Sequence, residues 1–100
     1  MNLQEVSTKI REVNQALTKD ASLREEHINT LITCHHQVTK LSKAYLSNPL
    51  LQEAHKRYTN TLHTIVNDYA VGDQLPKNVI KQLINVTKIL ATAQVAQGSN

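Results

Sequence analysis

Apolar residues recur at spacings of three and four along most of this 100-residue chain, and this period constrains the fold more than any other feature. Such spacing puts side chains on one stripe of an α-helix, whereas a half-buried strand would alternate at a spacing of two. The first stripe consists of Leu3, Val6, Ile10, Val13 and Leu17. The chain is therefore expected to consist of amphipathic helices that bury their stripes against one another.

Capping signals predict where the first two helices begin. Asn2 with Glu5, and Ser22 with Glu25, have the spacing of a capping box, in which a side chain before the helix accepts a hydrogen bond from a backbone N–H of the first turn. The second box implies that the first helix ends near residues 19–21.

Two more signals delimit the second half of the chain. Asn48 followed by Pro49 predicts a helix start, because proline at the first helical position has the required φ and misses no hydrogen bond. Gly72 is expected to end this third helix in the left-handed conformation. The fourth helix should begin around Pro76, with Leu75 packing back against its first turn.

The remaining stripes complete the expected core. They are Leu23, Ile28, Leu31, Val38, Leu41 and Tyr45, then Leu51, Ala54, Tyr58, Leu62, Ile65 and Tyr69, then Val79 or Ile80 with Leu83, Val86, Thr87 and Leu90. Connections of roughly three to six residues would make consecutive helices antiparallel neighbours. The predicted fold is all-α, an antiparallel up-down-up-down four-helix bundle in one domain, residues 1–100, with a frayed tail at about residues 97–100.

Composition limits the functional classes. With 40% hydrophobic residues, two Gly and two Pro, the chain has a globular composition. A single cysteine, Cys34, excludes an intrachain disulfide and fits a reducing compartment. No stretch has the ~18 apolar residues that cross a bilayer, so we expect no integral membrane segment. Together these features predict a cytoplasmic protein.

The sequence contains no pattern typical of a catalytic or metal site. Five histidines are present, but none forms the His-x-x-x-His pair that puts two metal ligands on one helix face. Cys34 lies near an apolar stripe, where a thiol is usually inert, and no glycine-rich phosphate loop occurs. We therefore expect no enzyme activity, no metal and no cofactor.

His55, in "EAHKRY", deserves comparison with a phosphate-accepting histidine. Lactose/cellobiose-type phosphotransferase IIA proteins are helical and of similar length, but their later histidine-rich motif is missing here. A histidine at the boundary of the apolar stripe is the favoured interpretation. Nucleic-acid binding is disfavoured, because Glu53 interrupts the basic cluster of Lys40, Lys43, Lys56 and Arg57 and no aromatic residues are interleaved with it.

The whole-chain layout resembles the immunity proteins that protect lactic acid bacteria against their own pediocin-like (class IIa) bacteriocins. The similarity covers nearly the whole length: about 100 residues, a basic balance, four helices, "NPLLQ" at the start of the third, and the hairpin "DYAVGDQLPKNVIKQLINVTKIL". Pro76 stands where the family often has Thr, Ser or Asn.

This resemblance implies a non-enzymatic role in the cytosol. Family members are thought to bind the mannose phosphotransferase permease once bacteriocin has occupied it, and their C-terminal half tends to set which bacteriocin is resisted. Peripheral association with the inner membrane face is compatible with that role, and nucleic acid is not an expected partner. The residues expected to contact the partner are Tyr69, Gly72, Asp73, Pro76, Lys77, Lys81 and Lys88.

Two alternatives stay open. The first is a generic helical interaction or regulatory module, in which Leu50, Ile84 and Ile89 form a second apolar face. The second is a phosphotransferase IIA-like protein with His55 as phosphoacceptor. Tyr69 could equally belong to the core, and the lysines could serve only as solvated charges.

Overall fold

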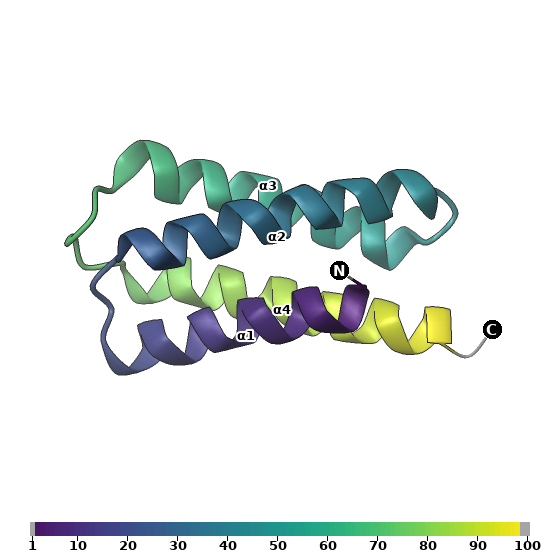
Figure 1. Cartoon of the computed structure of the whole chain (residues 1–100), viewed down its shortest axis with the longest axis horizontal. Helices are drawn as coiled ribbons and strands as arrows, with labels where there is room; N and C mark the ends of the chain where they lie inside the picture. The colour runs from purple at the N-terminus through teal and green to yellow at the C-terminus, as the bar shows by residue number, and fades with distance from the viewer. Residues whose placement is uncertain (1, 99–100) are drawn as a thin grey trace.

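The protein is an antiparallel up-down-up-down four-helix bundle. The computed structural model describes the backbone of residues 2–98 and the side chains of residues 2–93. Its helices are α1 (Leu3–Lys19), α2 (Glu25–Ala44), α3 (Pro49–Asp68) and α4 (Lys77–Gly98). Each helix packs on its neighbours in the chain, and α1 also packs on α4, which closes a ring of four (Figure 1). The bundle measures 42 × 23 × 22 Å.

The predicted starts of α1 and α3 are confirmed. The Asn2 side chain accepts a hydrogen bond from the backbone N–H of Glu5 at 2.9 Å. Asn48 accepts likewise from Leu51 N–H at 3.1 Å, and Pro49 is the first residue of α3. Each cap satisfies one of the backbone N–H groups that a helix start leaves without an intrahelical partner.

The predicted capping box at Ser22 is wrong. The residue before α2 is Arg24, which is extended and makes no side-chain cap. Ser22 lies two residues earlier and forms an antiparallel bridge with Gln74, in the connection between α3 and α4. A contact with a distant part of the chain has therefore replaced the local one. The expected end of α1 near residues 19–21 is confirmed, since the helix ends at Lys19.

The connection between α3 and α4 is longer than the three to six residues expected. Helix α3 ends at Asp68, so Gly72 lies inside the loop of residues 69–76 and does not terminate the helix. Gly72 does have the left-handed backbone expected of it, with φ 96°. Helix α4 begins directly after Pro76, whose carbonyl accepts from the N–H groups of Val79 and Ile80 at 3.1 and 3.2 Å.

Most of the expected stripe residues are buried in one core. All five members of the α1 stripe are buried, as are Leu23, Leu31 and Val38, Leu51, Ala54, Tyr58, Leu62 and Ile65, and Leu75, Val79, Ile80, Leu83, Val86, Thr87 and Leu90. Three positions of the second stripe differ: Ile28 and Leu41 are half-buried, and Tyr45 is 42% exposed because α2 ends at Ala44. Fraying at about residues 97–100 falls partly outside the described residues; α4 itself continues to Gly98.

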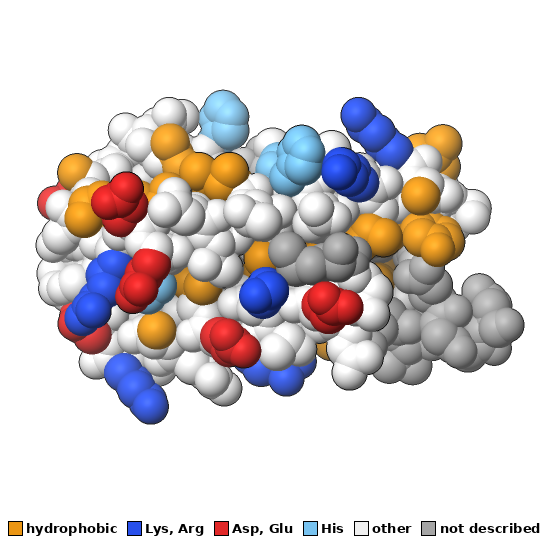
Figure 2. Space-filling model, viewed as in Figure 1, with side chains coloured by type: hydrophobic (Ala, Val, Ile, Leu, Met, Phe, Trp, Pro, Cys, Tyr) orange, Lys and Arg blue, Asp and Glu red, His pale blue; other side chains and the backbone are white. Residues whose placement is uncertain are grey.

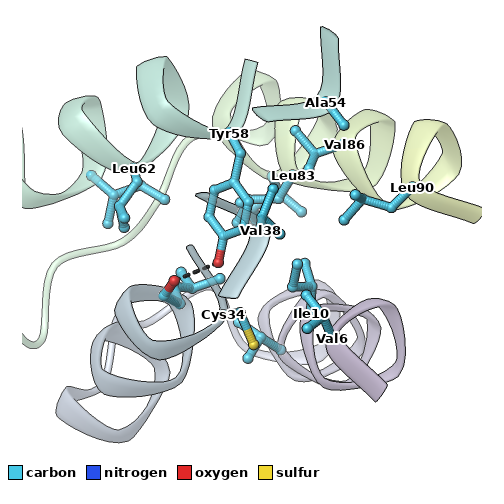
Figure 3. Packing of buried hydrophobic residues seen from close by; sticks show 14 of the residues in the cluster. Val6, Ile10, Cys34, Val38, Ala54, Tyr58, Leu62, Leu83, Val86 and Leu90 are labelled. Atoms are coloured by element: carbon cyan, nitrogen blue, oxygen red, sulfur yellow. Dashed lines mark hydrogen bonds between the residues drawn. The ribbon is translucent and has the colours of Figure 1, made fainter. Parts of the chain in front are cut away.

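Tyr58 connects α3 to α2 through the centre of the bundle. Its hydroxyl donates a hydrogen bond to the backbone carbonyl of Leu31 (Figure 3). Cys34 is fully buried, as predicted, on the side of α2 that faces Val6 and Ile10 of α1 (Figure 3). No helix in the described part of the chain has an apolar stretch long enough to span a bilayer.

Candidate functional site

The turn between α3 and α4 lies beside the turn between α1 and α2, at one end of the bundle (Figure 1). Three backbone hydrogen bonds join them: Leu23 N–H to Asp73 carbonyl at 2.8 Å, Gly72 N–H to Leu23 carbonyl at 2.7 Å, and Leu75 N–H to Ala21 carbonyl at 2.9 Å. We call these joined turns, residues 20–24 and 69–76, the two-loop clasp. These bonds satisfy backbone groups of both turns, so they tie the hairpin turn to the turn between α1 and α2.

Side chains strengthen the two-loop clasp. The Gln74 amide donates to the Ser22 hydroxyl at 2.7 Å, and Ser22 N–H donates to a carboxylate oxygen of Asp20 at 3.1 Å. The hydrogen bond from Ser22, aided by the Arg24 charge 3.6 Å away, lowers the pKa of the exposed Asp20 carboxyl. The contact between Gln74 and Ser22 does not follow from a local pattern, because these two residues are 52 positions apart.

Most of the expected partner-binding residues gather at this end. Gly72, Asp73, Pro76, Lys77 and Lys81 are all exposed and lie in the hairpin turn or the first turns of α4. The Asp73 carboxylate is already engaged, since it accepts from Ala70 N–H at 2.9 Å within the turn. Its role is therefore to shape the loop as well as to contribute charge.

The other two expected residues differ: Tyr69 lies at this end without being fully exposed, and Lys88 lies elsewhere. Tyr69 is half-buried and packs against the core at the end of α3, which supports its core interpretation. Lys88 is exposed but lies eleven residues after Lys77, about 16 Å further along α4 at 1.5 Å per residue. It lines a groove between α1 and α4 instead.

Exposed apolar residues occupy both ends of the molecule, and residue spacing alone did not reveal them. Val71, in the hairpin turn, is 59% exposed, and Leu46, in the turn between α2 and α3, is 75% exposed. Hydrophobic side chains are visible at both ends of the face in Figure 2, with acidic and basic side chains mixed between them. In the sequence, the exposure of Val71 is indicated only by its position between the third and fourth predicted helices.

The α2–α3 interface contains a polar cluster built from two His-x-x-x-Thr pairs. His35 and Thr39 of α2 face His55 and Thr59 of α3. The His35 Nε2 atom lies 2.8 Å from the Thr59 hydroxyl, and the His55 Nε2 atom lies 3.0 Å from the Thr39 hydroxyl. The two imidazole rings stack with centroids 5.5 Å apart.

The hydrogen bonds determine which ring nitrogens carry protons. Each threonine donates its only hydroxyl proton to the carbonyl of the histidine one turn earlier, Thr39 to His35 and Thr59 to His55. A threonine that keeps this bond accepts from the facing histidine, which assigns the proton of each ring to Nε2. Burial, and then the neighbouring imidazoles of His55, His36 and His63, lower the pKa of His35.

The interior side chains of His55, Cys34 and Tyr58 are hydrogen-bonded or kept neutral by burial. His55 is half-buried with its Nε2 atom engaged, which agrees with a boundary histidine. Burial raises the pKa of the Cys34 thiol and strongly raises the pKa of the Tyr58 hydroxyl, so both stay neutral near pH 7. Within residues 2–98, no three His, Cys, Asp or Glu side chains are grouped so that they could hold a metal ion.

Comparisons with known proteins add no relative. No family model, no curated protein and no solved structure matches this chain.

Proposed function

We propose that this protein is a bacteriocin immunity protein that acts in the cytosol of a producer cell. Its partner would be the mannose phosphotransferase permease with a class IIa bacteriocin bound. One observation carries the proposal beyond the whole-chain resemblance: the hairpin turn is fixed by the two-loop clasp, while Val71, Pro76 and Lys77 remain exposed on it. This is the surface expected of a protein that docks and does no chemistry.

A fixed turn favours binding because little conformational entropy is lost on docking. Val71 offers an apolar contact that is 59% exposed before binding. Lys77 and Lys81, one turn apart on α4, supply positive charge that attracts the protein to the anionic cytoplasmic face of a membrane, where the permease lies. Apolar and basic groups on one rigid end therefore suit a membrane-protein partner.

The experiment is survival of a bacteriocin-sensitive strain that expresses the chain, measured against a panel of class IIa bacteriocins. We expect resistance to one or a few members of the panel. Lys77→Glu with Lys81→Glu should reduce that resistance, whereas Lys43→Glu, an exposed lysine near the opposite end, should not. Full sensitivity to every bacteriocin, with folded protein present in the cells, would contradict the proposal.

A non-enzymatic mechanism is part of the proposal, and His55 provides its test. Incubation with phosphorylated phosphocarrier protein should leave no phosphate on histidine, because the His55 Nε2 atom is engaged by Thr39 and its ring is stacked on His35. His55→Gln should keep full protection in a folded protein. Histidine-bound phosphate, lost in His55→Gln, would favour the phosphotransferase alternative.

A second candidate function is an interaction module that binds through the other end of the bundle. Leu46 is 75% exposed there, with Tyr45 and Leu50 also exposed. Ile84 and Ile89 do not join Leu50 in this surface, since both are half-buried against the core. Leu46→Gln and Val71→Gln distinguish the candidates: loss of protection only in the Leu46 variant would favour this end.

A further inference from the structure

A groove of about 680 Å³ runs between α1 and α4, outside the two-loop clasp and outside the surface of the proposed function. Its walls include Arg11, Gln15 and Lys19 from α1, and Ile84, Lys88 and Ala91 from α4. Arg11 and Lys19 are about 12 Å apart along the axis of α1, since they are eight residues apart. Both the volume and the length are within the range of sites for small organic ligands.

The groove combines positive charge with an apolar floor. Arg11, Lys19 and Lys88 contribute three cations, and among the residues whose side chains the structure describes, no carboxylate lines the groove. The ion pairs within the described residues join Arg24 to Asp20 and Arg57 to Glu53, so they do not neutralise these three. Ile84 and Ala91 supply apolar surface between the charges, which complements a molecule with both an anionic group and hydrocarbon.

Asn14, which also lines the groove, carries an unsatisfied polar atom. Its side chain is only 5% exposed, its Nδ2 donates to the Thr87 hydroxyl at 2.8 Å, and its Oδ1 has no hydrogen-bond partner. Thr87 in turn donates to the Leu83 carbonyl at 3.0 Å. A buried acceptor without a partner is costly and uncommon.

The Asn14 amide can instead present a donor. If the Thr87 hydroxyl turns from the Leu83 carbonyl to Asn14, the amide can reverse, so that Oδ1 accepts from Thr87 and Nδ2 is released. In a regular helix the backbone N–H of Thr87 also donates to the Leu83 carbonyl, so this carbonyl would still have a hydrogen-bond donor. In that arrangement no acceptor is left unpaired, and the partial positive charge of the Asn14 amide nitrogen favours an anion bound nearby.

We propose that this groove binds a single-chain anionic amphiphile, a long-chain carboxylate. The bond between Asn14 and Thr87 sets the register of the two helices, with Arg11 and Lys88 within about one turn of it. The carboxylate is bound there, by charge-assisted hydrogen bonds that arginine can make in pairs. The hydrocarbon chain lies along Ile84 toward Lys19, whose aliphatic stem covers it.

The test uses dodecanoate, added below its micelle concentration and followed by calorimetry and by amide chemical shifts. We expect saturable binding, with shifts concentrated on α1 and α4 around residues 11–19 and 84–91. Acetate lacks the hydrocarbon chain, and dodecanol lacks the negative charge. Each should bind at least about tenfold more weakly than dodecanoate, because acetate buries no chain and dodecanol makes no charge-assisted hydrogen bond. Equal affinity for dodecanoate and dodecanol, or shifts confined to other helices, would overturn the proposal.

Matched variants test the two halves of the site. Arg11→Gln with Lys88→Gln should weaken dodecanoate binding about tenfold or more, while Lys77→Gln, which removes a lysine of the hairpin, should change it less than about twofold. Asn14→Leu removes the unsatisfied acceptor, so its Tm should equal or exceed that of the original chain although its affinity falls.

Asn14→Asp is a second variant at this position, to be used if the Asn14→Leu protein does not fold. It keeps the shape and adds a negative charge, which should nearly abolish binding of the carboxylate. Unchanged affinity in the Arg11/Lys88 double variant, or in both folded Asn14 variants, would contradict the assignment.

Discussion

His35 and His55 are held in a reciprocal arrangement in which each ring donates to the threonine of the other helix. The His35 ring is half-buried and lies next to the His55 imidazole, 5.5 Å away by ring centroid. Burial, and then this neighbouring ring, oppose a charge on His35 and lower its pKa. The cluster therefore joins α2 and α3 best when His35 is neutral.

Stability should accordingly fall when the medium is acidified. The pKa of His35 is lowered in the folded protein, so below the unfolded value of about 6.5 the unfolded chain binds more protons than the folded one. The free energy of unfolding should decrease as pH falls from about 6.5 toward the lowered folded pKa. His35→Gln should reduce this slope in urea titrations, and an unchanged slope would contradict the assignment.

Tyr58 allows a second prediction at the scale of one residue. Its hydroxyl donates to the Leu31 carbonyl in the core, and a net hydrogen bond of this kind contributes about 1 kcal/mol. Tyr58→Phe should lower the free energy of unfolding by that amount, as measured by urea denaturation. Tyr45→Phe, at an exposed tyrosine, is the control and should change it by less than about 0.5 kcal/mol. Equal effects of the two substitutions would contradict the role of the buried hydroxyl.

At the scale of elements, the sequence predicted the features that depend on contacts between residues close together in the chain. The caps at Asn2 and Asn48 could be derived because donor and acceptor are three residues apart. Ser22 has the same local signal, yet it pairs with Gln74 in another loop. Contacts across fifty residues follow from packing of the whole bundle, so neither the clasp nor the later start of α2 could be derived from spacing.

The two-loop clasp makes Gly72 a sensitive position. With φ 96° it has a backbone conformation that residues with a Cβ rarely adopt, although a Cβ there would have no atom within 4 Å. The cost of Gly72→Ala should therefore be conformational, about 1–2 kcal/mol in the free energy of unfolding. Gly72→Asn should cost less, because asparagine tolerates the left-handed region better. Thermal or urea unfolding measures both, and an alanine variant as stable as the original would refute this account.

At the scale of the whole molecule, the periodic stripes were sufficient to predict the four-helix bundle. They were not sufficient to predict which residues lie together on its surface. A stripe specifies which face of each helix is buried, so the ring of four helices and most of its core followed from it. It does not specify how the outward faces of two helices combine. Spacing therefore groups Lys88 with Lys77 and Lys81, whereas in the structure it lines the α1–α4 groove, as do Arg11 and Lys19.

The same limit applies to the candidate site. Gly72, Pro76 and Lys77 could be assigned to an exposed hairpin because turn residues and exposed charges have local signatures. Val71 and the residue pairs that join the two loops of the clasp have no such local signature. Tyr69 was ambiguous, since an aromatic residue at a helix end can pack inward or outward, and it packs against the core.

The central proposal is that the hairpin decides which bacteriocin this chain resists, and an exchange of residues 69–90 with those of a pediocin-like bacteriocin immunity protein tests it most directly. The exchange can preserve the two-loop clasp, because most of its bonds are between backbone atoms and do not depend on side chains. The measurement is survival of a sensitive strain against a panel of class IIa bacteriocins, with both chimeras shown to be folded by circular dichroism. We predict that the resistance spectrum follows residues 69–90. A spectrum that follows residues 1–68 would contradict the claim and would point to the basic region around Lys56 and Arg57.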